Sequence, residues 1–247
     1  MYFLTLTQRS KRRLLGFAAL MALLILGIVL LRPPPQTAVP VIGAPQPLRN
    51  VATSRREIAL TFDLSWGTVM PPKVLAVLER QHVRATFFLS GPWAKDHPNL
   101  VRRIVAGGFQ IESHGSRHVN YSGLSAKDLR RNIEDASADI QAASGIRPTM
   151  LRPPNGDYNG QTLQVASSLG YTVVLWGTDS RDWLNPGASN IVHRVLAKAH
   201  PGDIVLLHAS DTCKQTDQAL PAIIRGLRDR GYRLVTLKEL LAGAASP

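Results

Sequence analysis

The feature that most constrains the fold of this chain is a regular alternation of short apolar segments with helical patterns. Seven segments rich in β-branched, aromatic and aliphatic residues are predicted strands: Ile58–Phe62, Ala85–Leu89, Phe109–Ile111, Thr149–Leu151, Thr172–Leu175, Ile204–Leu207 and Arg233–Val235. Six helical patterns lie between them, around residues 74–78 and 100–105 and over 125–143, 160–169, 188–199 and 217–230. Strands that alternate with helices predict an α/β fold with a parallel sheet.

Polar residues gather where five of these strands end. They are Asp63, the pair His114 and His118, Arg152 with Asn155, the pair Asp179 and Asp182, and His208. In a β/α barrel the C-terminal ends of the strands meet on one face, where active sites are built. The chain is therefore predicted to form a barrel of about seven parallel strands rather than an open doubly wound sheet.

The residue types at these strand ends indicate hydrolytic chemistry. Two imidazoles four residues apart, His114 and His118, can bind a divalent transition metal, zinc first and cobalt or nickel next. Taken singly, each site has a plain structural reading: surface histidines in a polar loop, an aspartate that caps a turn, a buried histidine. Together they supply a base, an acid, metal ligands, a guanidinium and a fixed N–H donor, which suffice to attack an amide or ester carbonyl with a metal-polarised water.

The N-terminal region has the pattern of a membrane anchor. Residues 1–13 are basic and are predicted to be a cytoplasmic tail, and residues 14–31 are an unbroken apolar run long enough to cross a bilayer. Residues 32–54 contain six prolines and predict a stiff linker, followed by the folded domain over 55–242 and a tail over 243–247. We expect a single-pass cell-membrane protein with its domain outside; a secreted protein with a cleaved signal is the alternative.

The net charge of the chain limits the classes of binding partner, and its cysteine content limits the possible disulfides. The formal net charge is +12, and removing the five basic residues among the first 32 leaves +7. The sequence contains no helix-turn-helix pattern, zinc-finger spacing or aromatic-basic ribbon, so we expect no nucleic-acid partner. An acidic wall polymer or a membrane surface fits the basic charge better, and no protein partner is indicated. The single cysteine, Cys213, excludes an internal disulfide.

Five ordered motifs give the chain a family resemblance. They are Thr61-Phe62-Asp63, His114-Gly115-Ser116-Arg117-His118, Arg152-Pro153-Pro154-Asn155-Gly156, Asp179–Trp183 and Leu206-Leu207-His208. They resemble the motifs of the NodB-type polysaccharide deacetylases, carbohydrate esterase family 4, over roughly residues 55–242. The segments 62–67 and 208–216 are most similar to the sporulation-linked branch called PdaB. The resemblance implies a distorted, incomplete β/α barrel.

The resemblance also implies a role for each residue of the first three motifs. Asp63 resembles the general base that activates water, and His114 and His118 resemble metal ligands. Arg152 resembles the group that orients the base. The backbone N–H of Asn155 resembles a donor to the oxyanion.

The last two motifs imply the acid and the acetyl pocket. His208 resembles the general acid that protonates the leaving amine, and Asp182 resembles the carboxylate that tunes it. Trp183 and Leu206 would line the pocket for the acetyl methyl group.

One position departs from the family pattern. The family usually places a second aspartate, a metal ligand, directly after the base, and here that residue is Leu64. Asp179 and Asp211 are candidates for extra metal or polar contacts. The sequence therefore predicts metal-assisted N-deacetylation of an acetylated wall glycan, peptidoglycan or a chitin-like oligosaccharide. The alternative is a weak or inactive wall-glycan-binding protein that keeps the fold.

Overall fold

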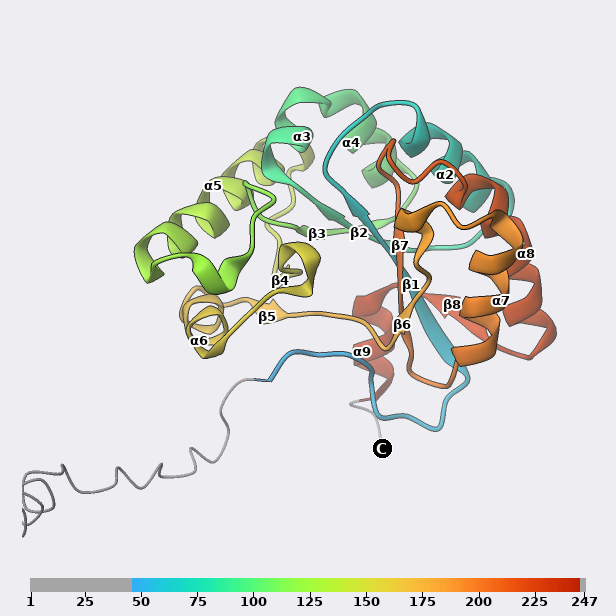
Figure 1. Ribbon diagram of the computed structural model, residues 1–247. Coiled ribbons are helices and arrows are strands. Elements are labelled where there is room, and N and C mark those ends of the chain that lie inside the picture. Colours follow the sequence, from blue (N-terminus) through green and yellow to red (C-terminus); the bar gives the residue numbers. More distant parts are fainter. Residues whose placement is uncertain (1–45, 245–247) are drawn as a thin grey trace, which may run out of the picture. The chain divides into compact units, whose positions relative to one another are not determined.

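A computed structural model describes residues 46–244 of the chain, and the domain it shows is built on one parallel sheet (Figure 1). The strands are β1 (Glu57–Leu64), β2 (Thr86–Leu89), β3 (Gln110–Ser113), β4 (Met150–Leu151), β5 (Thr172–Val173), β6 (Thr178–Asp179), β7 (Ile204–His208) and β8 (Arg233–Val235). Every pairing within this sheet is parallel. The α/β class and the parallel sheet predicted from the sequence are confirmed.

The strand order gives an incomplete barrel. The order is β5-β4-β3-β2-β1-β7-β6, and within the described residues β5 and β6 do not pair with each other. Strand β8 pairs with residues 57–59 of β1, whereas β2 pairs with residues 61–64. Because β7 occupies one edge of β1, β2 and β8 must share the other edge. This sharing distorts the sheet. The sheet is not closed by a β5–β6 pairing, and Leu48 forms a bridge with Val174 at the end of β5.

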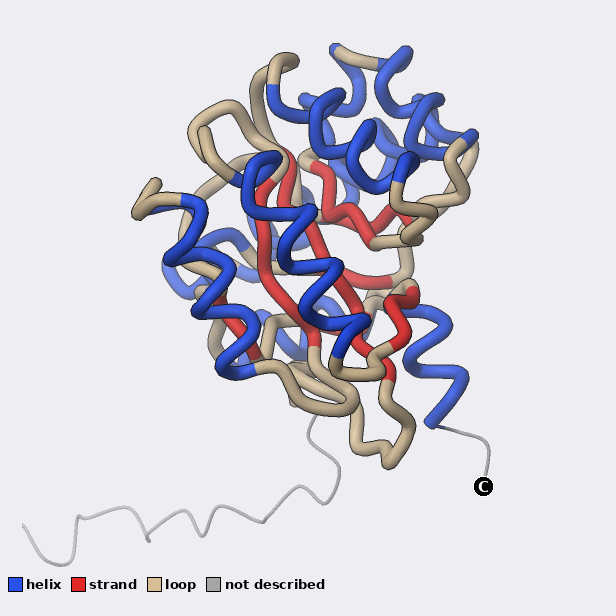
Figure 2. Tube along the Cα trace, turned by 90° about the vertical axis from the view of Figure 1, so that its right-hand side faces the viewer, coloured by secondary structure: helices blue, strands red, loops and turns tan. Residues whose placement is uncertain are grey.

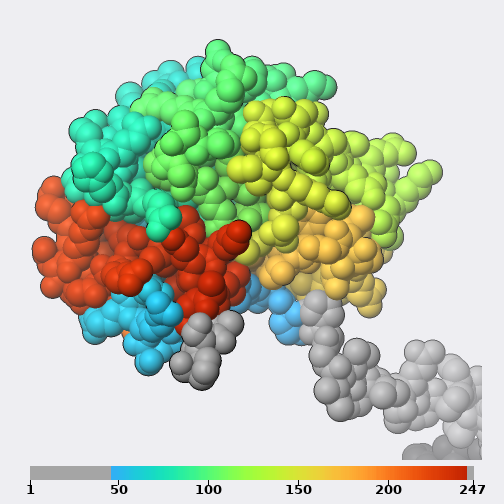
Figure 3. All heavy atoms as spheres, turned by 180° about the vertical axis from the view of Figure 1, so that it is seen from behind, coloured from blue at the N-terminus to red at the C-terminus, as the bar shows by residue number. Residues whose placement is uncertain are grey.

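Helices cover the convex side of the sheet (Figures 1 and 2), except for the last one, whose Leu237 and Leu240 pack in the apolar cluster that contains Ala59 of the inner face. They are α2 (Met70–Arg80), α3 (Gly91–Asp96), α4 (Pro98–Ala106), α5 (Ala126–Ser144), α6 (Gly160–Ser168), α7 (Ala188–Lys198), α8 (Thr216–Asp229) and α9 (Leu237–Ala244), with short 3₁₀ turns η1 (Tyr121–Gly123), η2 (Pro154–Gly156) and η3 (Asp182–Leu184). Helix α9 lies near the start of β1, where Arg55 donates a hydrogen bond to the carbonyl of Gly243 at 3.0 Å. In the view from behind, the C-terminal segment (red) lies beside the segment that leads into β1 (blue) (Figure 3).

Successive side chains of β1 point alternately into the apolar core and toward the candidate site. Ile58, Leu60, Phe62 and Leu64 all belong to the large apolar cluster, which includes residues of α2, α4 and α8. Residues on the other face of the same strand lie inside the barrel, because successive side chains of a strand point to opposite faces. Ala59 packs there in a second cluster, and Asp63 lies on the same face at the mouth.

The sequence predicted most of these elements. All seven predicted strands are present, but β6 was missed because two residues carry no detectable pattern. Helices α3 and α9 were also missed. The predicted anchor over 14–31 and most of the predicted linker lie outside the described residues. Within residues 46–244, no helix is both long and apolar enough to cross a bilayer.

Candidate functional site

The candidate site is a pocket of about 380 Å³ at the C-terminal ends of the strands. The predicted site residues that line it are Asp63, His114, His118, Asn155, Asp179, Trp183, Leu206 and His208. Arg152 and Asp182 are each 0% exposed and lie behind this lining. Strands β1, β3 and β7 and the loops after them therefore bring together residues separated by up to 145 positions in the sequence.

Asp63 is held by Arg152. The Arg152 Nη1 donates to Asp63 Oδ1 at 2.8 Å, and its Nη2 donates to the carbonyl of Leu175 at 2.9 Å. The guanidinium also lies 4.1 Å from the ring centroid of Phe88. Burial raises the pKa of Asp63, but the charge and hydrogen bond of Arg152, with a contribution from His208, outweigh burial and hold the pKa below its usual value. Asp63 is therefore an ionised carboxylate with one oxygen directed by an arginine.

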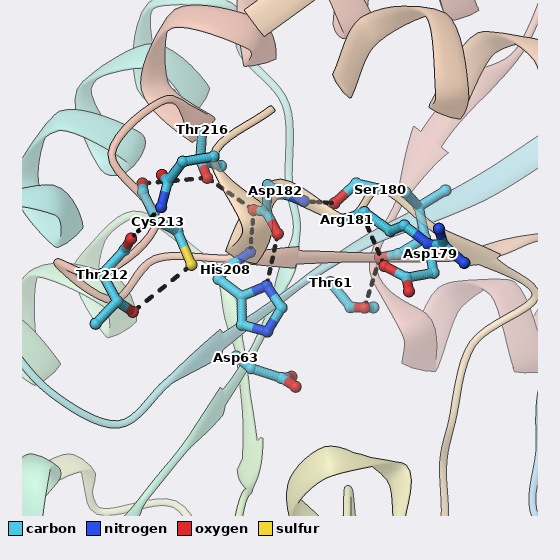
Figure 4. Close-up of polar contacts among 12 residues, drawn as sticks. Thr61, Asp63, Asp179, Ser180, Arg181, Asp182, His208, Thr212, Cys213 and Thr216 are labelled. Carbon is cyan, nitrogen blue, oxygen red and sulfur yellow. Dashed lines mark hydrogen bonds and ion pairs between the residues drawn. The ribbon is translucent and has the colours of Figure 1, made fainter. Parts of the chain in front are cut away.

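His208 is held by Asp182 (Figure 4). The imidazole Nδ1 lies 2.6 Å from Asp182 Oδ1, and the backbone N–H of His208 donates to Asp182 Oδ2 at 2.7 Å. The hydroxyl of Thr216 donates to that same Oδ2 at 2.7 Å. Burial lowers the pKa of His208, but Asp182 outweighs burial and raises it. With Nδ1–H bonded to the carboxylate, Nε2 is the nitrogen that faces Asp63 across the pocket, and it is suited to donate a proton.

His114 has the orientation of a metal ligand. Its Nδ1 lies 2.8 Å from the carbonyl oxygen of Arg152, which can only accept a hydrogen bond, so Nδ1 carries the proton. Its Nε2, which carries the lone pair, lies 3.7 Å from Asp63 Oδ2. Burial lowers the pKa of His114 to about 4, so the ring is neutral near neutral pH and this contact is not an ion pair. Ligating histidines commonly have such a backbone partner on the second nitrogen.

The described residues do not assemble a complete metal site around this imidazole. His118 lies beside it, with the ring centroids 5.4 Å apart, and also packs edge-on against Trp66. Among the residues that the structure describes, Asp63, His114 and His118 do not bring three ligand atoms within 4.8 Å of one another. Structural and catalytic zinc sites need three or four protein ligands. The residues present therefore supply part of a metal site and not a full ligand set.

The third metal ligand is missing because residue 64 is a leucine. Its side chain is 0% exposed and belongs to the large apolar cluster, on the face of β1 opposite to Asp63. Leucine offers no ligand atom, and this position is where the family pattern has a carboxylate. The missing ligand is thus replaced by a core residue and not by another polar group at the same place.

Another cluster, Asp182, His208 and Cys213, does bring three potential ligand atoms within 4.8 Å of one another. Both oxygens of Asp182 already accept hydrogen bonds, and burial raises the pKa of the Cys213 thiol to about 12. Burial therefore favours the protonated thiol over the thiolate, which is the form that binds metal. We therefore assign this cluster to the orientation of His208. Cys213 also lines the pocket.

Aromatic residues form much of the remaining wall. Trp183 is 50% exposed and Leu206 is 3% exposed, and both line the pocket. Trp66 and Trp176 also line it, although sequence reasoning did not select them. A signal was available for both, because Trp176 directly follows the predicted strand 172–175 and Trp66 comes three residues after Asp63, itself a predicted site residue.

Asn155 sits in a strained turn. Its backbone has φ 59° and ψ 7°, in the left-handed region, and its side chain donates to Asn120 Oδ1 at 2.8 Å. Gly156 follows with φ 66°, and a Cβ there would collide with Trp176. The turn therefore fixes the backbone of residue 155 at the pocket wall and allows Trp176 to close against it.

The two further acidic candidates have different positions. Asp179 lines the pocket, and its Oδ1 accepts the backbone N–H of Arg181 at 2.8 Å. The carboxylate of Asp211 instead accepts the backbone N–H groups of Thr68, Val69 and Met70 at 2.6–3.2 Å, at the start of α2. Asp211 is therefore a helix-capping carboxylate in this structure.

Comparison with known proteins places this geometry in a family. The sequence pattern of the family Polysaccharide deacetylase matches residues 50–174. A peptidoglycan-N-acetylglucosamine deacetylase of Bacillus cereus is 37% identical over 78% of this chain and 91% of its own length. The uncharacterized protein YlxY of Bacillus subtilis is 29% identical over 80% of this chain, and the chain spans only 61% of that relative.

Solved structures of the same family have a similar fold. BA3943 of Bacillus anthracis, described as a pseudoenzyme of family CE4, aligns with a TM-score of 0.77 at 29% identity, over 81% of this chain and 70% of that one. A mutant of BA3943 with restored enzymatic activity aligns with the same TM-score at 30% identity, over 81% and 73% of the two chains. With matching sequence pattern, fold and site motifs, this chain belongs to the polysaccharide deacetylase family, carbohydrate esterase family 4.

Proposed function

We propose that this chain binds an N-acetylated cell-wall glycan, peptidoglycan or a chitin-like oligosaccharide, and hydrolyses its acetyl groups weakly or not at all. The observation that carries the proposal is a family pocket with its polar pairs in place but without a third metal ligand. Relatives named as peptidoglycan-N-acetylglucosamine deacetylases support the glycan as ligand. The aligned pseudoenzyme BA3943 supports the reduced activity.

The pocket has the chemistry of a sugar site. Exposed indole faces such as Trp66, 41% exposed, and Trp183, 50% exposed, offer flat apolar surfaces to the C–H faces of pyranose rings. Asp63 and His208 offer a charged acceptor and a donor to the acetamido group at the base of the pocket. A few convergent polar groups in a mostly apolar cavity are typical of small-molecule sites.

Hydrolysis needs more than these groups. In this family a divalent metal polarises the carbonyl and lowers the pKa of water, which supplies several kcal/mol of transition-state stabilisation. Asp63 can accept a proton from water, but without a bound metal that water remains a poor nucleophile. Binding energy is therefore retained while most of the rate enhancement is lost.

The second candidate function is N-deacetylation itself. It is favoured by the intact pairs Asp63–Arg152 and His208–Asp182, which place a base and an acid on opposite sides of the pocket. Burying charged residues is costly unless they are paired, and their presence fits a catalytic use. In this reading Asp63 takes a proton from water and His208 protonates the leaving amine.

Calorimetric titration of the full-length protein distinguishes these functions. We expect an N-acetylglucosamine oligomer to bind, with and without a metal chelator, and a fully deacetylated oligomer of the same length to bind more weakly. Trp183→Ala should weaken binding, whereas Ile146→Ala, which also removes an exposed apolar side chain, should not. Absence of binding would refute the proposal, and rapid zinc-dependent acetate release would establish the second candidate.

We also propose that the domain works outside the cell membrane, tethered by residues 14–31, and that it acts in spore formation as in the PdaB branch. The basic cluster and apolar run support the first point, and the motif segments 62–67 and 208–216 support the second. Fractionation of cells should recover the full-length chain with membranes. A soluble cytoplasmic form of full length would contradict the anchor, and equal expression in growing and sporulating cells would contradict the link to spores.

A further inference from the structure

A second cavity lies on the other side of the loop that carries Asp182. It has a volume of about 420 Å³ and is formed by η3, the residues around it and one face of α7. Basic side chains dominate its wall: Arg181, His193, Arg194 and Lys198. Among the described residues that line it, none is an aspartate or a glutamate.

The positive charges of this basic groove are not neutralised by neighbours. Within residues 46–244, Arg181, Arg194 and Lys198 form no salt bridge. Arg194 uses only its Nε, which donates to the backbone carbonyl of Asp179 at 2.9 Å. Arg194 and Lys198 are four residues apart on α7, so they lie on the same face of the helix. Uncompensated cations converging on one concavity attract an anion, and guanidinium groups suit a carboxylate.

The basic groove and the active-site pocket share one loop. Asp179 and Trp183 line the pocket, whereas Ser180, Arg181 and Leu184 line the basic groove. Asp182 turns toward His208, and Arg181 extends away from it (Figure 4). Trp183 and Leu184 are 50% and 52% exposed on the crest between the cavities. A polymer that lies across this crest would contact both.

We propose that the basic groove binds a carboxylate carried by the glycan whose N-acetylated sugar occupies the pocket. The inference rests on the proposed function and makes its ligand more specific: an acidic, peptidoglycan-like strand rather than a neutral chitin-like one. Two carboxylates have the required chemistry, the lactyl group on alternate sugars and the acids of attached peptides.

The test compares glycans of equal length and acetylation on the full-length protein. The probes are a neutral N-acetylglucosamine oligomer, a peptidoglycan oligomer, the same oligomer with its carboxylates amidated, and the oligomer stripped of peptides. The double variant Arg181→Gln/Lys198→Gln removes two groove charges. The control Arg225→Gln/Lys238→Gln removes the same charge from exposed positions on α8 and α9. Melting temperatures verify that both variants fold.

We expect wild type to bind the acidic oligomer roughly tenfold more tightly than its amidated form, with a preference that weakens as salt rises. The groove variant should lose most of this preference, and the control should keep it. A preference that survives peptide removal assigns the lactyl carboxylate, and one that disappears assigns the peptide.

Two results would overturn the inference. Equal affinity of wild type for the acidic and amidated oligomers would show that no carboxylate is bound, and a preference unchanged in the groove variant would place the carboxylate elsewhere. In both cases binding of the neutral oligomer leaves the proposed function standing. Failure of every glycan to bind would refute the proposed function, and this inference with it.

Discussion

Replacing Leu64 with aspartate should convert an incomplete metal site into a complete one, at a cost to stability. Leu64 is the last residue of β1, and it lies in register with Leu89 of β2, which is in register with Ser113 of β3. His114 directly follows Ser113. Two strand spacings, roughly 9.6 Å, separate the backbones at 64 and 113. Leu64 points into the apolar core, so an aspartate at this strand end has to turn its carboxylate away from the core and toward His114 to reach the metal.

The size of the effect follows from burial. Leu64 is 0% exposed, so its removal from the core costs about 1.5–3 kcal/mol. A carboxylate there without a partner adds a few kcal/mol more. Zinc at one hundred times its dissociation constant would return about 2.7 kcal/mol. For a domain of this size that corresponds to a rise in melting temperature of about 5–10 °C.

The assay is a melting curve of Leu64→Asp and wild type across a zinc titration, with Leu64→Asn as the matched control. Asparagine has nearly the same shape as aspartate and carries no charge, so it should show the destabilisation without the zinc response. Wild type should respond far less than Leu64→Asp. If wild type and Leu64→Asp show the same small response, residue 64 does not reach the metal and our account of the missing ligand is wrong.

Three further outcomes are expected. Arg152→Met should destabilise the domain by about 3–5 kcal/mol in denaturant unfolding, because it leaves Asp63 buried without its partner; a loss below about 1 kcal/mol would contradict the pairing. Asp211→Asn should cost about 1 kcal/mol through the start of α2 and leave the zinc response of Leu64→Asp intact; loss of that response would make Asp211 a ligand. The pKa of His114 is about 4 in the folded chain, compared with an ordinary value of 6.5. Between these two pH values the imidazole takes up a proton in the unfolded chain but not in the folded chain. Stability should therefore fall by on the order of 3 kcal/mol from pH 7 to pH 4, and His114→Asn should remove that part of the slope.

The sequence predicted the parts of the fold that carry a repeating pattern. Long apolar strands such as β1 and amphipathic helices such as α5 have periodicities that identify them without any tertiary information. Strand β6 has only two residues and exists because Thr178 pairs beside Val205 of β7, which is a tertiary contact. Helix α3 has six residues and begins with Gly91-Pro92, a pair that is typical of a turn. The helix start is fixed by a tertiary contact, in which the Gly91 N–H donates to the carbonyl of Gly115.

For the site, the sequence predicted which residue types gather but not how they pair. Asp63, His208 and Arg152 were selected because they follow strands, and parallel strands bring such residues to one edge. The sequence could not show that Asp182 uses Oδ1 on the His208 ring and Oδ2 on the His208 N–H and the Thr216 hydroxyl, because that depends on the path of η3. It also could not show that Leu64 faces the apolar core, whereas the structure settles this through the alternation of β1.

The most direct test of the central claim measures binding and hydrolysis on one sample. Full-length wild-type protein is titrated with an N-acetylated glycan oligomer at saturating zinc, while acetate in the same solution is quantified. We expect saturable binding with acetate release near the uncatalysed background, and a clear increase in release for Leu64→Asp. Wild-type turnover as fast as that of Leu64→Asp would contradict it, because the chain would then have a working metal centre without a carboxylate at position 64.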